Sequence, residues 1–160
     1  MKKVLIAYYS KTATSKRVCE IIKETLEKND IEVHVLLFEE VRHIKEYDQV
    51  IMAAPINAMS WVGAGKNFLD KFQSDLREKE TIILYISYIL KCGNKFWKKR
   101  MLQSMEKIGK AIDVNMIHGF GGVIQEGFPA FARLIFGIKK DTPLDLSNDQ
   151  EVIRFAEELL

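Results

Sequence analysis

Hydroxyl side chains are concentrated in one short segment near the N-terminus. The apolar run Val4–Tyr9 leads directly into Ser10-Lys11-Thr12-Ala13-Thr14-Ser15, after which a helical pattern begins. A fully apolar run is typical of a buried parallel strand. The start of the following helix offers free backbone N–H groups and the positive end of the helix dipole to an anion. Because four hydroxyls can add hydrogen bonds there, the segment predicts a phosphate-binding loop for a mononucleotide.

The glycine pattern excludes two common nucleotide-binding loops. The P-loop requires G-x-x-x-x-G-K-[ST] and the dinucleotide loop requires G-x-G-x-x-G, but the segment 10–15 contains no glycine. The later Gly63-Ala64-Gly65-Lys66 stretch imitates a P-loop, yet Ser60 stands at the first glycine position and Asn67 at the Ser/Thr position. The alternative for the hydroxyl-rich loop is that one threonine only caps the helix. Capping needs one hydroxyl, and this loop has four.

Length and composition indicate that residues 1–160 form one domain, with 48% hydrophobic residues to build a core. No apolar run approaches the ~20 residues that a membrane-spanning helix needs. No small-residue cleavage site follows the N-terminal Met1-Lys2-Lys3. Cys19 and Cys92 are too few and too far apart for a disulfide framework or a zinc site. We therefore expect a cytoplasmic protein without a metal.

Strand and helix patterns alternate along the whole chain. We expect strands at 3–9, 32–38, 49–54, 81–88 and 115–122, and helices at 14–28, 64–76, 94–110 and 147–160. The last helix starts at a capping box formed by Ser147 and Gln150, and a short helix is considered for the polar segment 39–48. This alternation predicts the α/β class, with a parallel, doubly wound sheet and right-handed crossovers. Ligands bind such sheets at the carboxyl ends of the strands.

The first strand and the hydroxyl-rich loop resemble the N-terminal signature of flavodoxins, which bind FMN. The resemblance rests on the apolar strand and on Tyr8, Ser10, Ala13 and Ser15 in their relative places. Ser15 replaces the threonine of the family pattern, which keeps a hydroxyl. The resemblance implies a flavodoxin-like three-layer fold, with a doubly wound five-stranded parallel sheet of order 2-1-3-4-5. It also implies non-covalently bound FMN as the cofactor.

The same resemblance assigns the loops after the third and fourth strands to the flavin ring. Their backbone amides would face its polar edge, and Trp61 or Tyr88 would lie over a ring face; the alternative for both aromatics is core packing. No acid–base pair is evident, so no catalytic residue is assigned, and the flavin itself supplies the redox chemistry. The cofactor-binding residues implied are Ser10, Lys11, Thr12, Ala13, Thr14, Ser15, Pro55, Ile56, Asn57, Ala58, Trp61, Ser87, Tyr88, Ile89, Cys92 and Gly93.

The charge distribution differs from that of electron-carrier flavodoxins, which are strongly acidic and so complement basic partners. The net charge here is +2. Basic side chains gather around the fourth helix, with only Glu106 among them: Lys91, Lys95, Lys98, Lys99, Arg100, Lys107 and Lys110. Such a helix is either a solvated face or a surface for an anionic substrate or an anionic membrane.

A long insert, at about 122–146, separates the last strand from the last helix. Its segment 128–140 is strongly apolar, with Arg133, Lys139 and Lys140 interspersed. Connections of this length are usually functional or disordered, and this composition is not that of a disordered segment. Three interpretations are open: contact with a membrane interface, a wall of an apolar pocket, or a cover over a sheet edge.

The hydroxyl-rich loop, the insert and the final helix together resemble the menaquinone-dependent protoporphyrinogen oxidase group of flavodoxin-like enzymes, although this insert is shorter and poorer in arginine. The resemblance implies an oxidoreductase that passes electrons from a reduced substrate, protoporphyrinogen, through FMN to a quinone. The apolar and basic composition of 128–140 separately predicts that this segment contacts a hydrophobic substrate or a lipid surface, in the latter case peripherally at the inner face of the membrane. No nucleic-acid partner is expected. Two other classes remain open: a soluble flavodoxin-type electron carrier and a flavodoxin-like module without redox activity.

Overall fold

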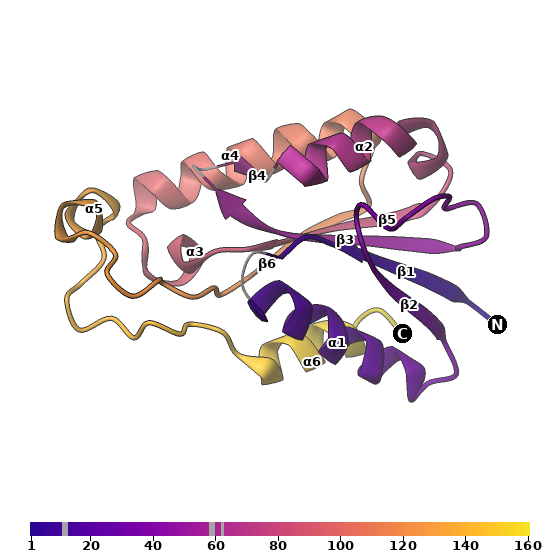
Figure 1. Ribbon diagram of the computed structural model, residues 1–160, viewed down its shortest axis with the longest axis horizontal. Coiled ribbons are helices and arrows are strands. Elements are labelled where there is room, and N and C mark those ends of the chain that lie inside the picture. Colours follow the sequence, from indigo (N-terminus) through magenta and orange to yellow (C-terminus); the bar gives the residue numbers. More distant parts are fainter. Residues whose placement is uncertain (11–12, 58–59, 62) are drawn as a thin grey trace.

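A parallel sheet with helices on both faces forms the centre of the computed structural model, which describes residues 1–10, 13–57, 60–61 and 63–160 (Figure 1). The parallel strands are β1 (Lys3–Tyr8), β2 (Glu32–Leu37), β3 (Gln49–Asn57), β5 (Glu80–Ile86) and β6 (Met116–Phe120). They lie in the order β2-β1-β3-β5-β6. A further strand, β4 (Ser60–Trp61), pairs antiparallel with the end of β3. The expected order 2-1-3-4-5 is therefore confirmed, with β4 as an addition too short to leave a sequence pattern.

The central position of β1 follows from its composition. Val4, Leu5, Ile6 and Ala7 are fully buried, because helices cover both faces of a parallel sheet. Leu5 and Ala7 belong to the apolar cluster on one face, whereas Val4 and Ile6 belong to the cluster on the other. This alternation is the two-residue repeat of a strand. With β2 on one side and β3 on the other, β1 has no free edge.

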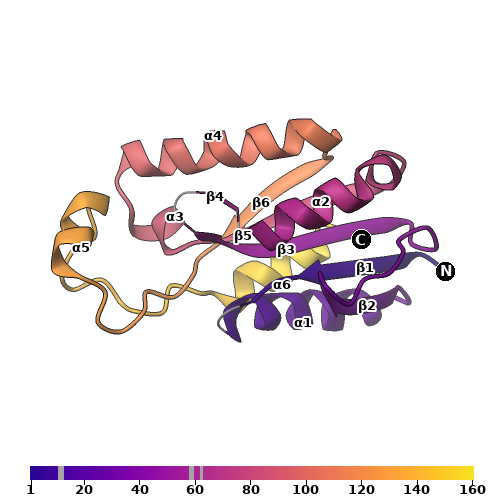
Figure 2. The ribbon, with the colours of Figure 1, turned by 45° about the horizontal axis from the view of Figure 1, so that its top comes forward.

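Two pairs of helices cover the two faces of the sheet (Figures 1 and 2). α2 (Gly63–Leu76) and α4 (Lys95–Ile112) lie over one face, and α1 (Ala13–Glu27) and α6 (Asp149–Glu157) lie over the other. α1 packs against the sheet through a stripe at helical spacing, formed by Val18, Ile22 and Leu26. Two short helices, α3 (Tyr88–Cys92) and α5 (Ala130–Phe136), lie toward and beyond the carboxyl ends of the strands.

The insert between β6 and α6 folds back on itself. Its two ends pair through an antiparallel bridge between Val123 and Asp145, and α5 lies at the far end of the excursion, away from the sheet (Figure 1). A Cβ atom on Gly121 would lie 1.9 Å from the carbonyl oxygen of Leu146, so the returning chain passes too close for any other residue. None of the helices in the described part of the chain is long and apolar enough to cross a membrane.

The polar segment 39–48 forms turns, and the short helix considered there is wrong. Val41, Ile44 and Tyr47 are buried at three-residue spacing and join the core cluster on the α2 and α4 face. These side chains hold the segment against the domain, so apolar anchoring replaces the hydrogen bonds of a regular helix.

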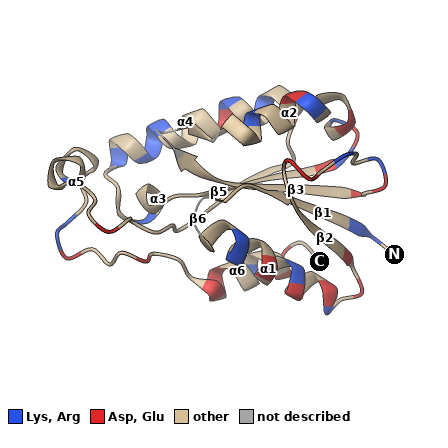
Figure 3. Ribbon diagram, viewed as in Figure 1, with Lys and Arg blue, Asp and Glu red and all other residues tan. Residues whose placement is uncertain are grey.

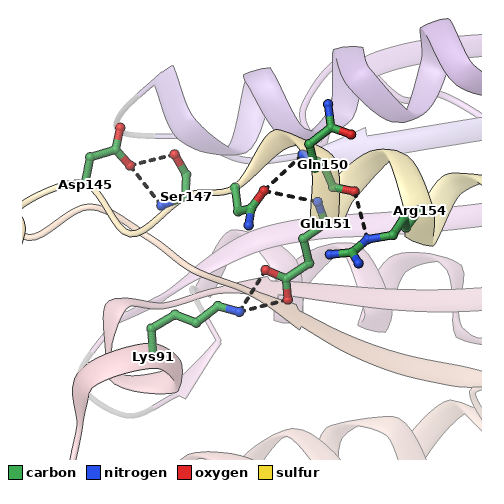
Figure 4. Close-up of polar contacts among 7 residues, drawn as sticks. Lys91, Asp145, Ser147, Gln150, Glu151 and Arg154 are labelled. Atoms are coloured by element: carbon green, nitrogen blue, oxygen red, sulfur yellow. Dashed lines mark hydrogen bonds and ion pairs between the residues drawn. The ribbon is translucent and has the colours of Figure 1, made fainter.

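The last helix begins one residue later than the expected capping box. Asn148 is the N-cap of α6, and its side chain accepts hydrogen bonds from the N–H groups of Gln150 and Glu151. Ser147 instead donates its backbone N–H and its hydroxyl to Asp145 (Figure 4). The expected cap at Ser147 is therefore wrong by one position, since asparagine caps a helix as well as serine does.

Candidate functional site

Three chain segments meet at the carboxyl edge of the sheet. Tyr8, at the end of β1, lies in register with Ala53 of β3, and Pro55 of β3 lies in register with Ile86 of β5. The pairing continues past the strand, because the N–H of Tyr9 donates to the carbonyl of Ala53 at 3.0 Å. The segments that follow β1, β3 and β5 are therefore neighbours, as ligand binding at this edge requires.

The first segment ends in the start of α1, one residue before the position expected from the sequence. Ala13 is exposed, Thr14 is half-buried and Ser15 is only 1% exposed; Lys11 and Thr12 lie outside the described residues. The first turn of α1 carries no acidic side chain. Its N–H groups and the helix dipole therefore favour an anion. Hydroxyl and N–H groups at this helix start can therefore donate hydrogen bonds to a phosphate group, with no carboxylate in the first turn to repel it.

The second segment follows β3, which runs three residues further than expected and includes Pro55, Ile56 and the backbone of Asn57. Pro55 and Ile56 are half-buried. The position of Ala58, also expected at the flavin, lies outside the described residues. The backbone of Asn57 pairs with Ser60, and that of Ile56 pairs with Trp61. Proline tolerates this position because it is close to the end of its strand.

Trp61 is a core residue in this structure. Its side chain is 1% exposed, its indole N–H donates to the carbonyl of Ala54 at 3.3 Å, and its ring meets the Phe38 ring edge-on. A Cβ atom on Gly65 would lie 2.6 Å from the indole ring. Gly65, part of the stretch that imitates a P-loop, therefore makes room for tryptophan. The structure matches the packing alternative for Trp61, and a flavin contact would require the ring to leave the core.

The third segment forms the short helix α3, where the sequence predicts a loop. Ser87 is its N-cap and accepts a hydrogen bond from the N–H of Ile89 at 3.2 Å. The N–H of Gly93 donates to the carbonyl of Ile89 at 2.9 Å and closes the helix. The amides of Ile89 and Gly93, both predicted to face the flavin, thus have acceptors within α3. A helix start also leaves first-turn N–H groups without an intrahelical acceptor, so the segment keeps donor capacity.

Of the predicted site residues in α3, Tyr88 and Cys92 have half-buried side chains. Burial, and secondarily Cys92, raises the pKa of the Tyr88 phenol, so this hydroxyl stays protonated and available as a donor. The Cys92 thiol donates to the carbonyl of Tyr88 at 3.1 Å. Burial also raises the pKa of Cys92, against the opposing effect of Lys98 and Arg133. The structure therefore presents Cys92 as a thiol and not as an activated thiolate.

A row of aromatic rings connects α3 to the insert and to the start of α4. The Tyr88 ring lies 5.5 Å from the Phe128 ring, which lies 6.3 Å from Phe136 of α5. Phe136 lies 5.2 Å from Trp97, and Trp97 lies 5.1 Å from Phe96. We call these five residues the aromatic row. Sequence reasoning missed Trp97, because nothing in the local pattern of α4 shows that the insert returns to it.

Hydrogen bonds fix the insert to α4 beside the aromatic row. The N–H of Asn94 donates to the carbonyl of Phe136 at 2.8 Å, and the indole N–H of Trp97 donates to the carbonyl of Ile135 at 2.8 Å. α5 ends at Gly137, which has a φ of 72° in the left-handed region that favours glycine. α5 is therefore held in a defined place next to the segment that follows β5.

The basic residues of α4 are mainly exposed, and Figure 3 shows their positions along the helix. Lys91, which the sequence groups with them, instead forms an ion pair with Glu151 of α6 at 2.8 Å (Figure 4). A second ion pair joins Arg17 of α1 to Asp149 of α6. Lys91 thus ties α3 to α6, and the basic surface is formed by the remaining residues of that group.

The parallel strands lie in the order β2-β1-β3-β5-β6, and a helix start that fits a phosphate lies at their carboxyl edge. This arrangement defines an α/β protein of the flavodoxin-like class. The family model described as "Flavodoxin domain" matches residues 5–142. The chain belongs to the flavodoxin domain family, a family of FMN-binding redox proteins. The expected flavodoxin family is therefore confirmed, whereas the resemblance to the protoporphyrinogen oxidase group stays a prediction. None of the curated proteins matches the chain.

Solved structures with the same fold include flavodoxins and an enzyme. Flavodoxin 1 from Bacillus cereus is 11% identical, with a TM-score of 0.64 and coverage of 98% of this chain and 96% of that one. A Fusobacterium nucleatum flavodoxin bound to flavin mononucleotide is 15% identical, with a TM-score of 0.62 and coverage of 99% and 97%. An NADH:FMN oxidoreductase in its apo form is 14% identical, with a TM-score of 0.61 and coverage of 99% and 88%. At these identities the likeness shows the fold alone.

Proposed function

We propose that this chain binds FMN non-covalently and acts as an oxidoreductase that passes electrons from a reduced organic substrate through FMN to a quinone. Membership of the flavodoxin domain family supports the cofactor, as does the FMN bound to the F. nucleatum structure. The donors at the start of α1 fit one phosphate group. The absence of a dinucleotide motif from the sequence favours FMN over FAD.

The chain's own residues have separate tasks in this proposal. Bound FMN supplies the redox chemistry, and the protein supplies binding, orientation and electrostatics. The N–H groups and hydroxyls at the start of α1 bind the phosphate. The N–H groups at the start of α3 favour negative charge at the same edge of the sheet. Tyr88, whose pKa burial raises further above neutral pH, offers a hydroxyl hydrogen bond beside them.

The aromatic row is the observation that favours an apolar substrate. It joins Tyr88 of α3 through the Phe128 ring to Phe136 of α5. Arg133 lies within α5, and Lys139 and Lys140 follow it. A large apolar molecule with carboxylates fits apolar rings flanked by cations. Protoporphyrinogen, with an apolar macrocycle and anionic propionates, is the candidate that the sequence resemblance implies.

A soluble electron carrier of the flavodoxin type is the second candidate. The size of the chain and the lack of an evident acid–base residue in the sequence favour it. A carrier needs no apolar insert next to the flavin segments. The aromatic row therefore ranks this candidate below the oxidoreductase.

An anaerobic flavin-reduction assay separates the two candidates. The protein, reconstituted with FMN, is mixed with protoporphyrinogen, NADPH or reduced ferredoxin, and then with a menaquinone analogue. We expect protoporphyrinogen to bleach the flavin absorbance and the quinone to restore it. Bleaching by reduced ferredoxin alone would favour the carrier. A protein that takes up no FMN would contradict both candidates and favour a module without redox activity.

A further inference from the structure

The outward face of α5 is apolar and uncovered. Phe131, Leu134 and Ile135, at positions i, i+3 and i+4 of the helix, are 68%, 83% and 51% exposed. Residues at this spacing share one face. The other side of α5 carries Phe136, which packs on Trp97. Large exposed apolar side chains that a fold does not need mark an interaction site, and we call these three residues the α5 face.

Cations are concentrated in the two chain segments that contain and adjoin the α5 face. Segments 94–100 and 126–141 are held together by hydrogen bonds from Asn94 to Phe136 and from Trp97 to Ile135. They contain seven lysines and arginines against the two carboxylates Glu126 and Asp141. Phe96, also in the first of these segments, is 60% exposed. The seven cations are Lys95, Lys98, Lys99, Arg100, Arg133, Lys139 and Lys140.

We propose that the α5 face docks on an anionic lipid bilayer, with its apolar side chains in the interface and the cations of these two segments on the headgroups. Apolar side chains flanked by lysine and arginine are the pattern of interfacial membrane helices, and each cation near an anionic leaflet adds to the attraction. α5 has 7 residues, so it lies in the interface and does not span the bilayer.

Charge argues against a second copy of this chain as the occupant. A symmetric pairing of two α5 faces would bring both sets of seven cations together, and like charges without partners oppose such an interface. An anionic lipid surface complements the apolar side chains and the cations at once.

Docking through α5 would also orient the candidate site. α5 lies beyond the carboxyl ends of the strands (Figure 1), and the aromatic row joins it to Tyr88. The edge that carries the predicted flavin segments would therefore be the edge nearest the bilayer, where a lipid-soluble quinone is found. This inference deepens the proposed function and rests on it for the acceptor.

Co-sedimentation with vesicles tests the docking. The full chain is incubated at low salt with sucrose-loaded vesicles of phosphatidylcholine alone or of equal parts phosphatidylcholine and phosphatidylglycerol. We expect binding to the anionic vesicles, weakened by high salt. The double variant Phe131→Gln/Leu134→Gln should bind at least about tenfold less, through lost apolar contact. Lys139→Glu/Lys140→Glu should lose at least about tenfold as well, through lost attraction to headgroups.

Matched controls lie at the opposite end of the molecule. Met116→Gln removes an exposed apolar side chain at the start of β6, and Lys28→Glu reverses an exposed charge after α1. Both should bind vesicles like the parent chain. Absence of binding to the anionic vesicles, or equal losses in the controls and the α5 variants, would overturn the proposal. So would an α5-dependent dimer seen by size exclusion without lipid, which would assign the face to a second copy.

Vesicle binding and FMN uptake are measured independently, so the two proposals fail separately. Loss of vesicle binding by a chain that still quenches FMN fluorescence contradicts the docking alone. A chain that binds vesicles through α5 but takes up no FMN contradicts the proposed function alone.

Discussion

Ser15 and Trp61 behave differently at the candidate site although the sequence assigns both to the flavin. Ser15 lies in the first turn of α1, where the helix start favours a phosphate. Trp61 has its indole N–H bonded to Ala54 and its ring packed over Gly65. A hydroxyl at a helix start has a local reason to bind an anion, whereas an aromatic ring after a strand also fits the core.

Replacing Ser15 with alanine should weaken FMN binding by about 1.5–3 kcal/mol, the typical contribution of a hydrogen bond to a charged group. Riboflavin, which lacks the phosphate, should bind the variant and the parent chain equally well. Fluorescence titration measures both ligands. Thr25→Ala is the matched control, because the Thr25 hydroxyl donates to the carbonyl of Ile21 within the same helix. Equal losses for FMN and riboflavin would contradict a phosphate contact.

His118 should make the stability of the fold depend on pH. Its ring packs against Phe120 and Phe155, and burial lowers its pKa from 6.5, despite the opposing effect of Glu151 and Glu158. The unfolded chain therefore binds a proton more readily than the folded one. Above the pKa that His118 has in the unfolded chain, its titration costs the fold nothing. As the pH falls through that pKa, the unfolded chain takes up the proton first, and the free energy of unfolding decreases.

The His118→Phe variant removes this titration and keeps an aromatic ring between the same neighbours. We expect urea unfolding to show a steeper loss of stability in the parent chain than in the variant as the pH falls from about 7.5 to about 5.5. Groups common to both proteins cancel in the comparison. Parallel pH profiles would show that His118 does not carry the effect.

At the scale of elements, the insert is held by its own backbone. Gly121→Ala would place a Cβ atom 1.9 Å from the carbonyl oxygen of Leu146, and a backbone atom cannot swing aside. We expect a loss of about 1–3 kcal/mol in the free energy of unfolding. Gly63→Ala is the control, since a Cβ atom on Gly63 would meet nothing within 4 Å. It should be neutral or stabilising by up to about 1 kcal/mol, because alanine favours a helix.

Excising 126–142 and joining its ends with a short glycine–serine linker should leave FMN binding intact. The three predicted flavin segments lie outside the excised part, and the bridge between Val123 and Asp145 remains. Quinone reduction should fall to the rate of free FMN. Trp97 loses its acceptor on Ile135, so its fluorescence should shift to the red.

Unfolding of the excised chain would identify the insert as a structural cover. Full quinone turnover by a folded variant would show that the insert is dispensable for the reaction, and the electron-carrier function would then be favoured. Circular dichroism, recorded beside the turnover assay, distinguishes these two outcomes.

At the scale of the whole molecule, ligand binding should raise the free energy of unfolding. A ligand that binds only the folded state at a hundred times its Kd adds about 2.7 kcal/mol. FMN should therefore raise the thermal midpoint, followed by circular dichroism, in proportion to the logarithm of its concentration. FAD at equal concentration should raise it less, because the loop is suited to one phosphate. Equal shifts for the two flavins would contradict a mononucleotide site.

The sequence by itself determined the features that depend on local pattern. The apolar run in β1, the alternation of strands and helices and the hydroxyl-rich start of α1 predicted the parallel α/β sheet and the edge at which the candidate site lies, whereas the strand order came from the resemblance to flavodoxins. These features follow from side-chain periodicity and from the exposed donors of a helix start, which neighbouring residues set. Boundaries shifted by one to three residues where an alternative cap or a longer strand was equally compatible with the sequence.

Only the tertiary structure decided which distant residues meet. It placed Trp61 in the core, turned Ser87 into the cap of α3, and paired Lys91 with Glu151, which lies 60 positions away. It also brought Phe136 of the insert onto Trp97 and left the α5 face uncovered. Such contacts depend on how the chain closes long loops and on what packs beside each side chain, and neither is contained in a local pattern.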